Sequence, residues 1–201
     1  MQELRLRSRK PESPSARLAL REATHVVHER LHEAPAFRAI ADRQLDRCGY
    51  AELLGRLLAF HRAVDPLIAQ GRAVLGFGDG SGNGARIGWL EADLAYLGGG
   101  KVPLVPAAAG DDWHAAGCLY VVEGSVLGGK LIHRQLDYLF AANEDGRSFF
   151  AGAAGAAGDS ARWRDLCGRL DAYGVQPGRL AAMTAGAAAA FALLEACLDA
   201  A

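Results

Sequence analysis

Apolar residues recur at intervals of three and four along most of the chain, which is the pattern of amphipathic helices. A first helix is predicted from about residue 15 to 33, where Leu20, Thr24, Val27 and Leu31 form one apolar stripe. Further helices are predicted over residues 39–48, 50–70, 87–97, 111–140, 163–173 and 177–198. No segment alternates with a period of two over the length of a strand. The pattern therefore predicts an all-α fold, with one domain of about seven helices.

The predicted helix after residue 111 is unusual for its glycines. Gly117, Gly124, Gly128 and Gly129 all fall inside it. An interior glycine costs roughly 1 kcal/mol relative to alanine, so the last three cost about 3 kcal/mol together. On a helical wheel, Gly117, Gly124 and Gly128 lie within about 40° of one another and form a strip without side chains. Such a strip suits either a flat ligand against the backbone or a close helix–helix crossing, and the adjacent glycines 128 and 129 would also allow a bend.

The first predicted helix carries three histidines, of which His28 is nearest the core. It lies roughly 60° from the centre of the apolar stripe, whereas His32 and His25 lie roughly 100° and 120° away. Arg21, seven residues earlier, lies on the same strip about 10 Å along the helix. An imidazole and a guanidinium so placed could hold a flat metal complex with carboxylates at its rim. A lone histidine at the edge of a core is more often structural, and the residues alone leave both interpretations open.

A second metal hypothesis comes from the same helix. Glu22-x-x-His25 and Glu29-x-x-His32 have the spacing of di-iron carboxylate bundles, which place one such pair on each of two helices. Both copies lie on one helix here, which disfavours a metal–carboxylate bundle enzyme.

Composition narrows the partners and the compartment. The chain has 201 residues, 51% of them hydrophobic, and its formal net charge of −1 gives no reason to expect nucleic acid or a membrane surface as partner. Its four cysteines include no C-x-x-C pair, as expected for reduced thiols in the cytoplasm. Residues 1–15 are predicted to form a flexible basic arm without the apolar core of a signal peptide. The longest uncharged run, Leu180–Leu194, has fifteen residues, which favours a buried helix over a membrane span.

Two stretches together carry a resemblance to a known family. The residues Glu22-Ala23-Thr24 followed by His28 resemble the haem oxygenase signature E-A-T-x-x-x-H, in which the histidine is the proximal iron ligand. The segment 120–129 resembles the distal helix of that family, and its E-G-S-x-x-G-G form is similar to that of bacterial members associated with biliverdin-binding phytochromes. The order and separation of the motifs match, and the resemblance extends over nearly everything from Leu18 onward.

The resemblance implies a fold and a set of site residues. Residues 16–201 are expected to form a multi-helix bundle in which haem b is sandwiched between a proximal helix and a kinked, glycine-rich distal helix. The proximal iron ligand would be His28. The basic residues expected near the haem propionates are Arg21, Arg164 and Arg169. The distal, catalytic positions would be Gly124, Ser125, Gly128 and Gly129.

The resemblance also implies an activity. A haem oxygenase uses haem as both cofactor and substrate, and cleaves the porphyrin ring with O2 and external electrons to biliverdin, carbon monoxide and ferrous iron. The electrons would come from a ferredoxin, a flavodoxin or a reductase. The biliverdin could pass to a bacteriophytochrome, and the protein would work in the cytoplasm.

Three positions depart from the family pattern. Ser125 stands where animal members have an aspartate that organises the distal water. His32 stands where the family has an acidic residue four positions after the proximal histidine. A second basic propionate contact falls on Gly168, with Arg169 adjacent, which would allow a rotated haem. The first two departures motivate an alternative, a haem-binding or haem-carrying protein of the same fold that does not open the ring.

Overall fold

The computed structural model describes residues 15–78, 82–141, 144–152 and 156–200, and in these ranges the regular structure is entirely helical. Eight α-helices and one short 3-10 helix follow one another in these ranges: α1 (Ala16–His32), α2 (Pro35–Ala41), α3 (Arg47–Leu75), α4 (Gly82–Tyr96), α5 (Asp112–Gln135), η1 (Leu136–Tyr138), α6 (Ser148–Ala151), α7 (Ala156–Tyr173) and α8 (Pro177–Asp199). The all-α prediction is confirmed. Of the predicted N-terminal arm, residues 1–14 lie outside the described residues.

Helix α1 forms where its stripe and cap predicted it. Ser15 is the N-cap, and its Oγ accepts a hydrogen bond from the Leu18 amide at 3.4 Å. The same hydroxyl donates to Asp171 of α7 at 2.8 Å, which fixes the start of α1 against that helix. Leu20, Thr24 and Leu31 are buried. The predicted stripe therefore does set which side of α1 faces the core.

The second predicted helix is placed differently. Pro35, which lies between the first two predicted helices, is the first residue of α2, where its fixed φ and missing amide are tolerated. The chain then turns through Arg43, a non-glycine residue with a φ of 57°. Helix α3 begins at Arg47, after Asp46, whose carboxylate accepts from the Gly49 amide at 2.7 Å. The predicted helix over residues 39–48 is thus wrong in its bounds, because α2 starts before it at Pro35 and α3 starts inside it after Asp46.

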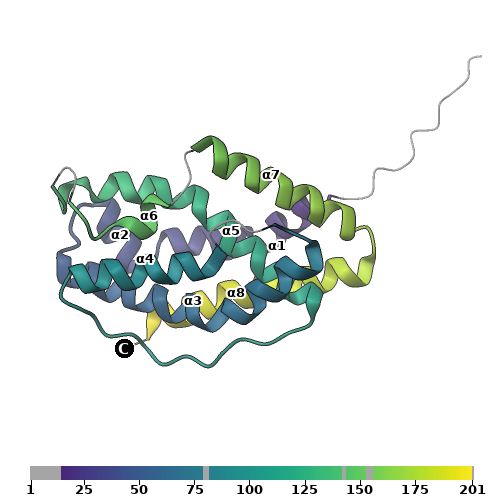
Figure 1. Cartoon of the computed structure of the whole chain (residues 1–201), viewed down its shortest axis with the longest axis horizontal. Coiled ribbons are helices and arrows are strands. Elements are labelled where there is room, and N and C mark those ends of the chain that lie inside the picture. Colours follow the sequence, from purple (N-terminus) through teal and green to yellow (C-terminus); the bar gives the residue numbers. More distant parts are fainter. Residues whose placement is uncertain (1–14, 79–81, 142–143, 153–155, 201) are drawn as a thin grey trace, which may run out of the picture.

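Helix α3 is the long central element of the bundle (Figure 1). The predicted core face is buried, at Leu53, Leu54, Leu57, Leu58 and Phe60. A connection spanning residues 97–111 runs along α3, and the amide of Ala108 donates to the carbonyl of Ala63 at 2.8 Å. This strap carries the chain from the end of α4 back to the start of α5.

Helix α5 is held by α3 and α8, with α6 and α7 on its remaining sides. Its N-cap is Asp111, whose carboxylate accepts from the amides of Trp113 and His114. Among the described helices, α5 with η1 (Asp112–Tyr138) and α8 are long and apolar enough to cross a membrane by length and composition alone. Helices α5 and α8 pack on each other in the bundle. The expectation that the chain meets no membrane stays a prediction.

Candidate functional site

Helices α1 and α5 share α8 as a common support. The ring of His28 on α1 lies edge-on to Phe191 of α8, with 6.2 Å between the ring centroids. On α5, Gly117 packs against the backbone of Met183, also on α8. In Figure 1, α1 is the fainter helix behind α5. Helix α1 makes its main described contacts with α8, α7 and α2, so α8 packs against both the helix that carries His28 and the helix that carries the glycines.

His28 is more open than its place on the wheel suggested, since its side chain is 55% exposed. Its Nδ1 lies 3.6 Å from Oε1 of Glu29, and its ring contacts that of His32 edge-on, with 4.7 Å between centroids. A carboxylate beside Nδ1 favours a hydrogen on that nitrogen, which leaves the lone pair of Nε2 for a metal. Glu29 is thus a candidate orienting partner that sequence reasoning missed by searching only position 32.

Arg21 belongs to α1, and its charge acts on Tyr120 of α5. Burial raises the pKa of the Tyr120 phenol, Cys167 adds to this, and the positive charges of Arg17 and Arg21 oppose it. Two guanidiniums of α1 therefore lie within electrostatic range of a half-buried tyrosine on α5. This places positive charge between the two helices, where a bound carboxylate would be favoured.

The two arginines predicted on α7 differ in their surroundings. Arg164 is exposed, and its Nε donates to the carbonyl of Ser160 at 3.3 Å. Arg169 instead caps α3, because its Nη1 donates to the carbonyls of Leu75 and Gly76 at 2.9 and 2.6 Å. Its Nε pairs with Asp165 at 3.0 Å. The structure engages the Arg169 guanidinium at the end of α3, and its role in binding a propionate stays a prediction.

The glycines of α5 do not act as one strip. Gly117 serves the crossing with α8, which is the helix–helix alternative. A Cβ at Gly124 would lie 3.2 Å from the ring of Trp163 on α7, and one at Gly129 would lie 3.5 Å from the carbonyl of Phe150. A Cβ at Gly128 would meet nothing within 4 Å. The bare backbone predicted for a ligand is thus centred on Gly128.

Large apolar side chains flank this open glycine. Leu127 and Leu131 are 41% and 52% exposed, and they lie in the part of α5 after Glu123, where Gly129 is the one buried residue. Together with Gly128 they form an uncovered apolar face on α5, which we call the α5 face. An apolar face on one helix and an imidazole on another, on two helices that both pack against α8, fit a large flat metal complex with acidic substituents.

Ser125, three residues before Gly128, is tied to α4. Its Oγ donates to the carbonyl of Val122 at 2.8 Å and accepts from Nη1 of Arg86 at 3.3 Å. Arg86 is only 9% exposed. No sequence motif marks Arg86, and the one signal is the spacing of this charged residue, three after Asn83 and four before Leu90, which are both buried in α4.

Beside Ser125, Glu123 joins three helices. Its carboxylate accepts two hydrogen bonds from Arg162 of α7, both at 2.8 Å, and one from Arg72 of α3 at 3.4 Å. Burial acts to raise the pKa of Glu123, but the hydrogen bonds from Arg162 and the charges of Arg86 and Arg72 outweigh it and lower the pKa. Glu123 is therefore ionised, and it sets the position of α7 relative to α5.

His61 of α3, expected in a half-buried position, is 2% exposed. Its Nδ1 lies 2.6 Å from Oδ1 of Asn83, whose amide nitrogen donates to the His61 carbonyl and to Asp65. Since the amide oxygen must accept, Nδ1 carries the hydrogen. Burial, with the nearby charge of Arg86, lowers the pKa of His61 to about 3, so the ring is neutral.

The metal–carboxylate hypothesis finds no support in the structure. Within the described ranges, no group of three or more histidine, cysteine, aspartate or glutamate side chains is placed to hold a metal ion. His25 and His28 each lie near the same Glu29, on the exposed side of α1. A single helix therefore presents these side chains without the second helix that such a centre needs.

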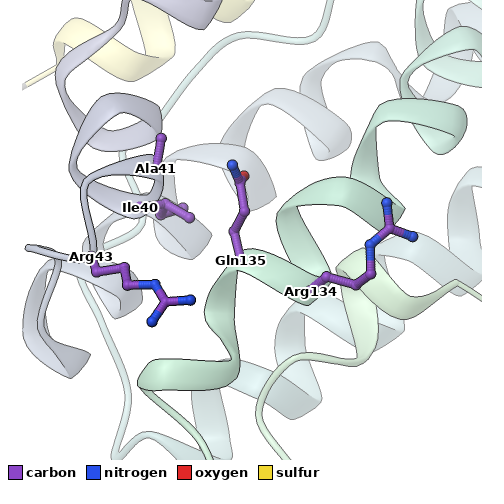
Figure 2. Close-up of a pocket in the computed structure, with 5 residues that line it drawn as sticks. All are labelled: Ile40, Ala41, Arg43, Arg134 and Gln135. Carbon is purple, nitrogen blue, oxygen red and sulfur yellow. The ribbon is translucent and has the colours of Figure 1, made fainter.

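A hollow of about 230 Å³ lies between α2 and the end of α5. It is lined by Ile40, Ala41, Arg43, Arg134 and Gln135 (Figure 2). In Figure 2 the guanidinium of Arg134 points away from that of Arg43, so the two cations do not converge on one ligand. On α5 the hollow is lined by Arg134 and Gln135, about one turn after Leu131 of the α5 face.

No protein-family model and no curated protein sequence matches the chain. Among solved structures, the chain is similar to the haem oxygenase of Neisseria meningitidis, determined with NO and CO bound, with a TM-score of 0.75 and 24% identity over 92% of this chain and 90% of that one. It is also similar to haem oxygenase-1 of the cyanobacterium Synechocystis sp. PCC6803 in complex with haem, with a TM-score of 0.69 and 16% identity over 92% and 91% of the two chains. The chain therefore has the all-α, single-domain fold of the haem oxygenases.

Proposed function

We propose that the chain is a haem oxygenase that binds haem b between α1 and α5 and opens its ring to biliverdin, releasing carbon monoxide and ferrous iron. The observation that carries the proposal is that α8 contacts both His28 of α1 and Gly117 of α5, the helix that also carries the uncovered α5 face. The shared fold adds to it, because the likeness extends over more than nine-tenths of the chain. When bound, haem supplies the iron that activates O2 and the ring that is opened.

On the proximal side, His28 would bind the iron through Nε2, with Glu29 holding the hydrogen of Nδ1. Arg21 would pair with a propionate near Tyr120, and the exposed Arg164 could reach the same edge. These charge-assisted contacts would fix the rotation of the ring in its plane, and with it the carbon that is attacked. Arg169 is held at the end of α3 and would have to leave that position to take part.

On the distal side, the absence of side chains matters most at Gly128. Its backbone would lie directly against the porphyrin, and Leu127 and Leu131 would cover the rest of that surface and exclude water. Gly124 accommodates the ring of Trp163, while Gly129 lets α6 approach α5. Ser125 would then be the polar side chain beside the bound gas.

A haem-binding or haem-carrying protein without ring opening is the second candidate. It is favoured by Ser125, a neutral hydroxyl at the position where a charged group would manage a proton, and by His32 in place of an acid. Both candidates predict haem binding through His28. They differ in what happens to the bound haem under reductant in air.

The test is an absorption titration with ferric haem, followed by ascorbate or a ferredoxin system in air. We expect saturation at one haem per chain and conversion to the broad red absorption of biliverdin. His28→Ala should alter the Soret band, whereas His25→Ala, a matched change of an exposed histidine one turn away, should not. Haem that binds through His28 and survives reduction would favour the carrier. Equal spectra for wild type and His28→Ala would contradict both.

The partners follow from the same proposal. Ring opening needs external electrons, so a ferredoxin, flavodoxin or reductase would dock near the haem edge. The E-G-S-x-x-G-G form of α5 favours delivery of biliverdin to a bacteriophytochrome in the cytoplasm. Coexpression with an apo-phytochrome tests this, because a far-red-absorbing holoprotein would form only with the active chain.

A further inference from the structure

The hydroxyl of Ser125 already uses its hydrogen and one of its lone pairs. The hydrogen is donated to the Val122 carbonyl at 2.8 Å, and Nη1 of Arg86 donates to the oxygen at 3.3 Å. A serine hydroxyl has one hydrogen and two lone pairs. One lone pair therefore remains, so in this arrangement Ser125 can accept a further hydrogen bond but cannot donate one.

Arg86 is built into the fold. It lies on the buried side of α4 with Asn83, three residues before it, and Leu90, four residues after it. Asn83 locks this part of α4 to α3 through its paired hydrogen bonds with His61. The guanidinium is therefore delivered to α5 by a rigid element and not by a flexible surface chain.

The nearest carboxylate on α5 is engaged elsewhere. Both oxygens of Glu123 accept from Arg162 of α7, and one also accepts from Arg72 of α3. Burial lowers the pKa of Arg86, and the positive charges of Arg162 and Arg72 add to this, whereas the negative charges of Glu123 and Asp159 oppose it. Arg86 nevertheless stays a cation near neutral pH, because a guanidinium loses its proton only far above it. A buried positive charge thus reaches the hydroxyl that borders the α5 face.

We infer that Arg86 is a positioning residue of the distal site, which fixes the Ser125 hydroxyl as a hydrogen-bond acceptor for water above the haem. The inference rests on the proposed function, because without haem against the α5 face the hydroxyl has nothing to organise. It follows that Ser125 is not the proton donor. The water that it holds carries the proton, and the charge of Arg86 makes that water more acidic.

The test uses ferric haem complexes of wild type, Arg86→Met, Arg86→Lys, Ser125→Ala and the Ser125→Ala/Arg86→Met double variant. The readout is the pH at the midpoint of the spectral change of the ferric complex, measured beside haem affinity and the melting temperature of the haem-free protein. We expect Arg86→Met to raise the midpoint by about half a pH unit, because a nearby positive charge favours the anionic form. Arg86→Lys keeps the positive charge, so its midpoint should stay close to that of the wild type.

The double variant isolates the role of the hydroxyl. In the Ser125→Ala background, Arg86→Met should shift the midpoint by less than half as much. Equal shifts in both backgrounds would show that Arg86 acts only through space, and a lower melting temperature with an unchanged midpoint would show a structural role; either result overturns the inference. If Arg86→Met does not fold, Arg86→Gln, which is also neutral but polar, replaces it in both backgrounds.

The proposed function fails separately from this inference. If the wild type binds haem through His28 and degrades it, but Arg86→Met leaves the pH midpoint unchanged, the proposed function stands and the inference is overturned. A wild-type protein that binds no haem overturns both.

Discussion

Gly117 of α5 lies so close to the backbone carbonyl of Met183 on α8 that a Cβ at this position would overlap the oxygen. The contact is reciprocal, since Gly186 of α8 lies in the same way against the carbonyl of His114 on α5. We expect Gly117→Ala to destabilise the haem-free protein by about 3 kcal/mol, because a clash with backbone cannot be relieved by a change of rotamer. Urea unfolding measures the difference.

Gly168→Ala is the matched control for this change. Gly168 lies inside α7, and a Cβ there would meet nothing within 4 Å. Alanine should therefore stabilise the protein by about 0.5–1 kcal/mol through helix propensity alone. If Gly117→Ala behaved like Gly168→Ala, the close crossing of α5 and α8 would be wrong.

Gly128→Ala separates folding from ligand binding. A Cβ at Gly128 would project into open space from a helix interior, so we expect a gain of about 0.5–1 kcal/mol in the stability of the haem-free protein. Under the proposed function the same methyl group would stand between the backbone and the porphyrin, so haem affinity should fall by about tenfold or more. Unfolding curves and Soret titrations on one preparation give both numbers.

A gain in stability without loss of haem affinity would mean that haem does not lie against Gly128. Gly88→Ala provides the comparison, because Gly88 lies exposed inside α4 with nothing within 4 Å of a Cβ, and this variant should gain stability and keep its haem affinity. The pair distinguishes a glycine kept for a ligand from one that is merely tolerated.

The elements that sequence predicted well are those set by local signals. The stripe from Leu20 to Leu31, the cap at Ser15 and the start of α8 at Pro177 all depend on residues within a turn or two of one another. The glycines of α5 were also correctly placed within one helix. Local sequence thus predicted the class and the bounds of α1 and α8, whereas α3, α4 and α7 start three, five and seven residues before the predicted positions.

The sequence could not predict which neighbouring helix packs against each turn of a given helix. Gly117, Gly124 and Gly128 share one side of α5, yet the first meets α8, the second meets Trp163 of α7, and the third is open. Only the packing of three helices decides this. The contact of Arg86 with Ser125 was missed for the same reason, because it joins residues 39 positions apart on two different helices.

His61 predicts a pH dependence of stability. Its pKa in the folded protein is about 3, below the usual value of 6.5, so the unfolded chain binds a proton more readily. Stability is therefore lost as pH falls below about 6.5, by up to about 1.4 kcal/mol per pH unit. His61→Gln, which cannot titrate, should flatten the dependence between about pH 4.5 and 6.5 in unfolding curves.

The exposed His25 supplies the control for that measurement. His25→Gln should keep the slope of the wild type. A slope equally steep in His61→Gln would mean that His61 is not held neutral in the core, and would contradict its burial beside Asn83.

Glu123 predicts a second dependence at lower pH. Its pKa is lowered in the folded state, so its pairing with Arg162 and Arg72 stabilises fully above the unfolded value of about 4.3 and is lost as pH falls through the folded value. Glu123→Gln should cost about 3 kcal/mol at pH 7, because it leaves buried guanidiniums without their anion. The difference from wild type should shrink below about pH 4, as the wild-type carboxylate takes up its proton.

Two controls accompany this measurement. His61 titrates in both proteins and cancels from the difference, and Glu22→Gln, on the exposed side of α1, should show no such loss. A difference that is the same at pH 3.5 and pH 7 would mean that the ion pairs around Glu123 do not hold α7 to α5.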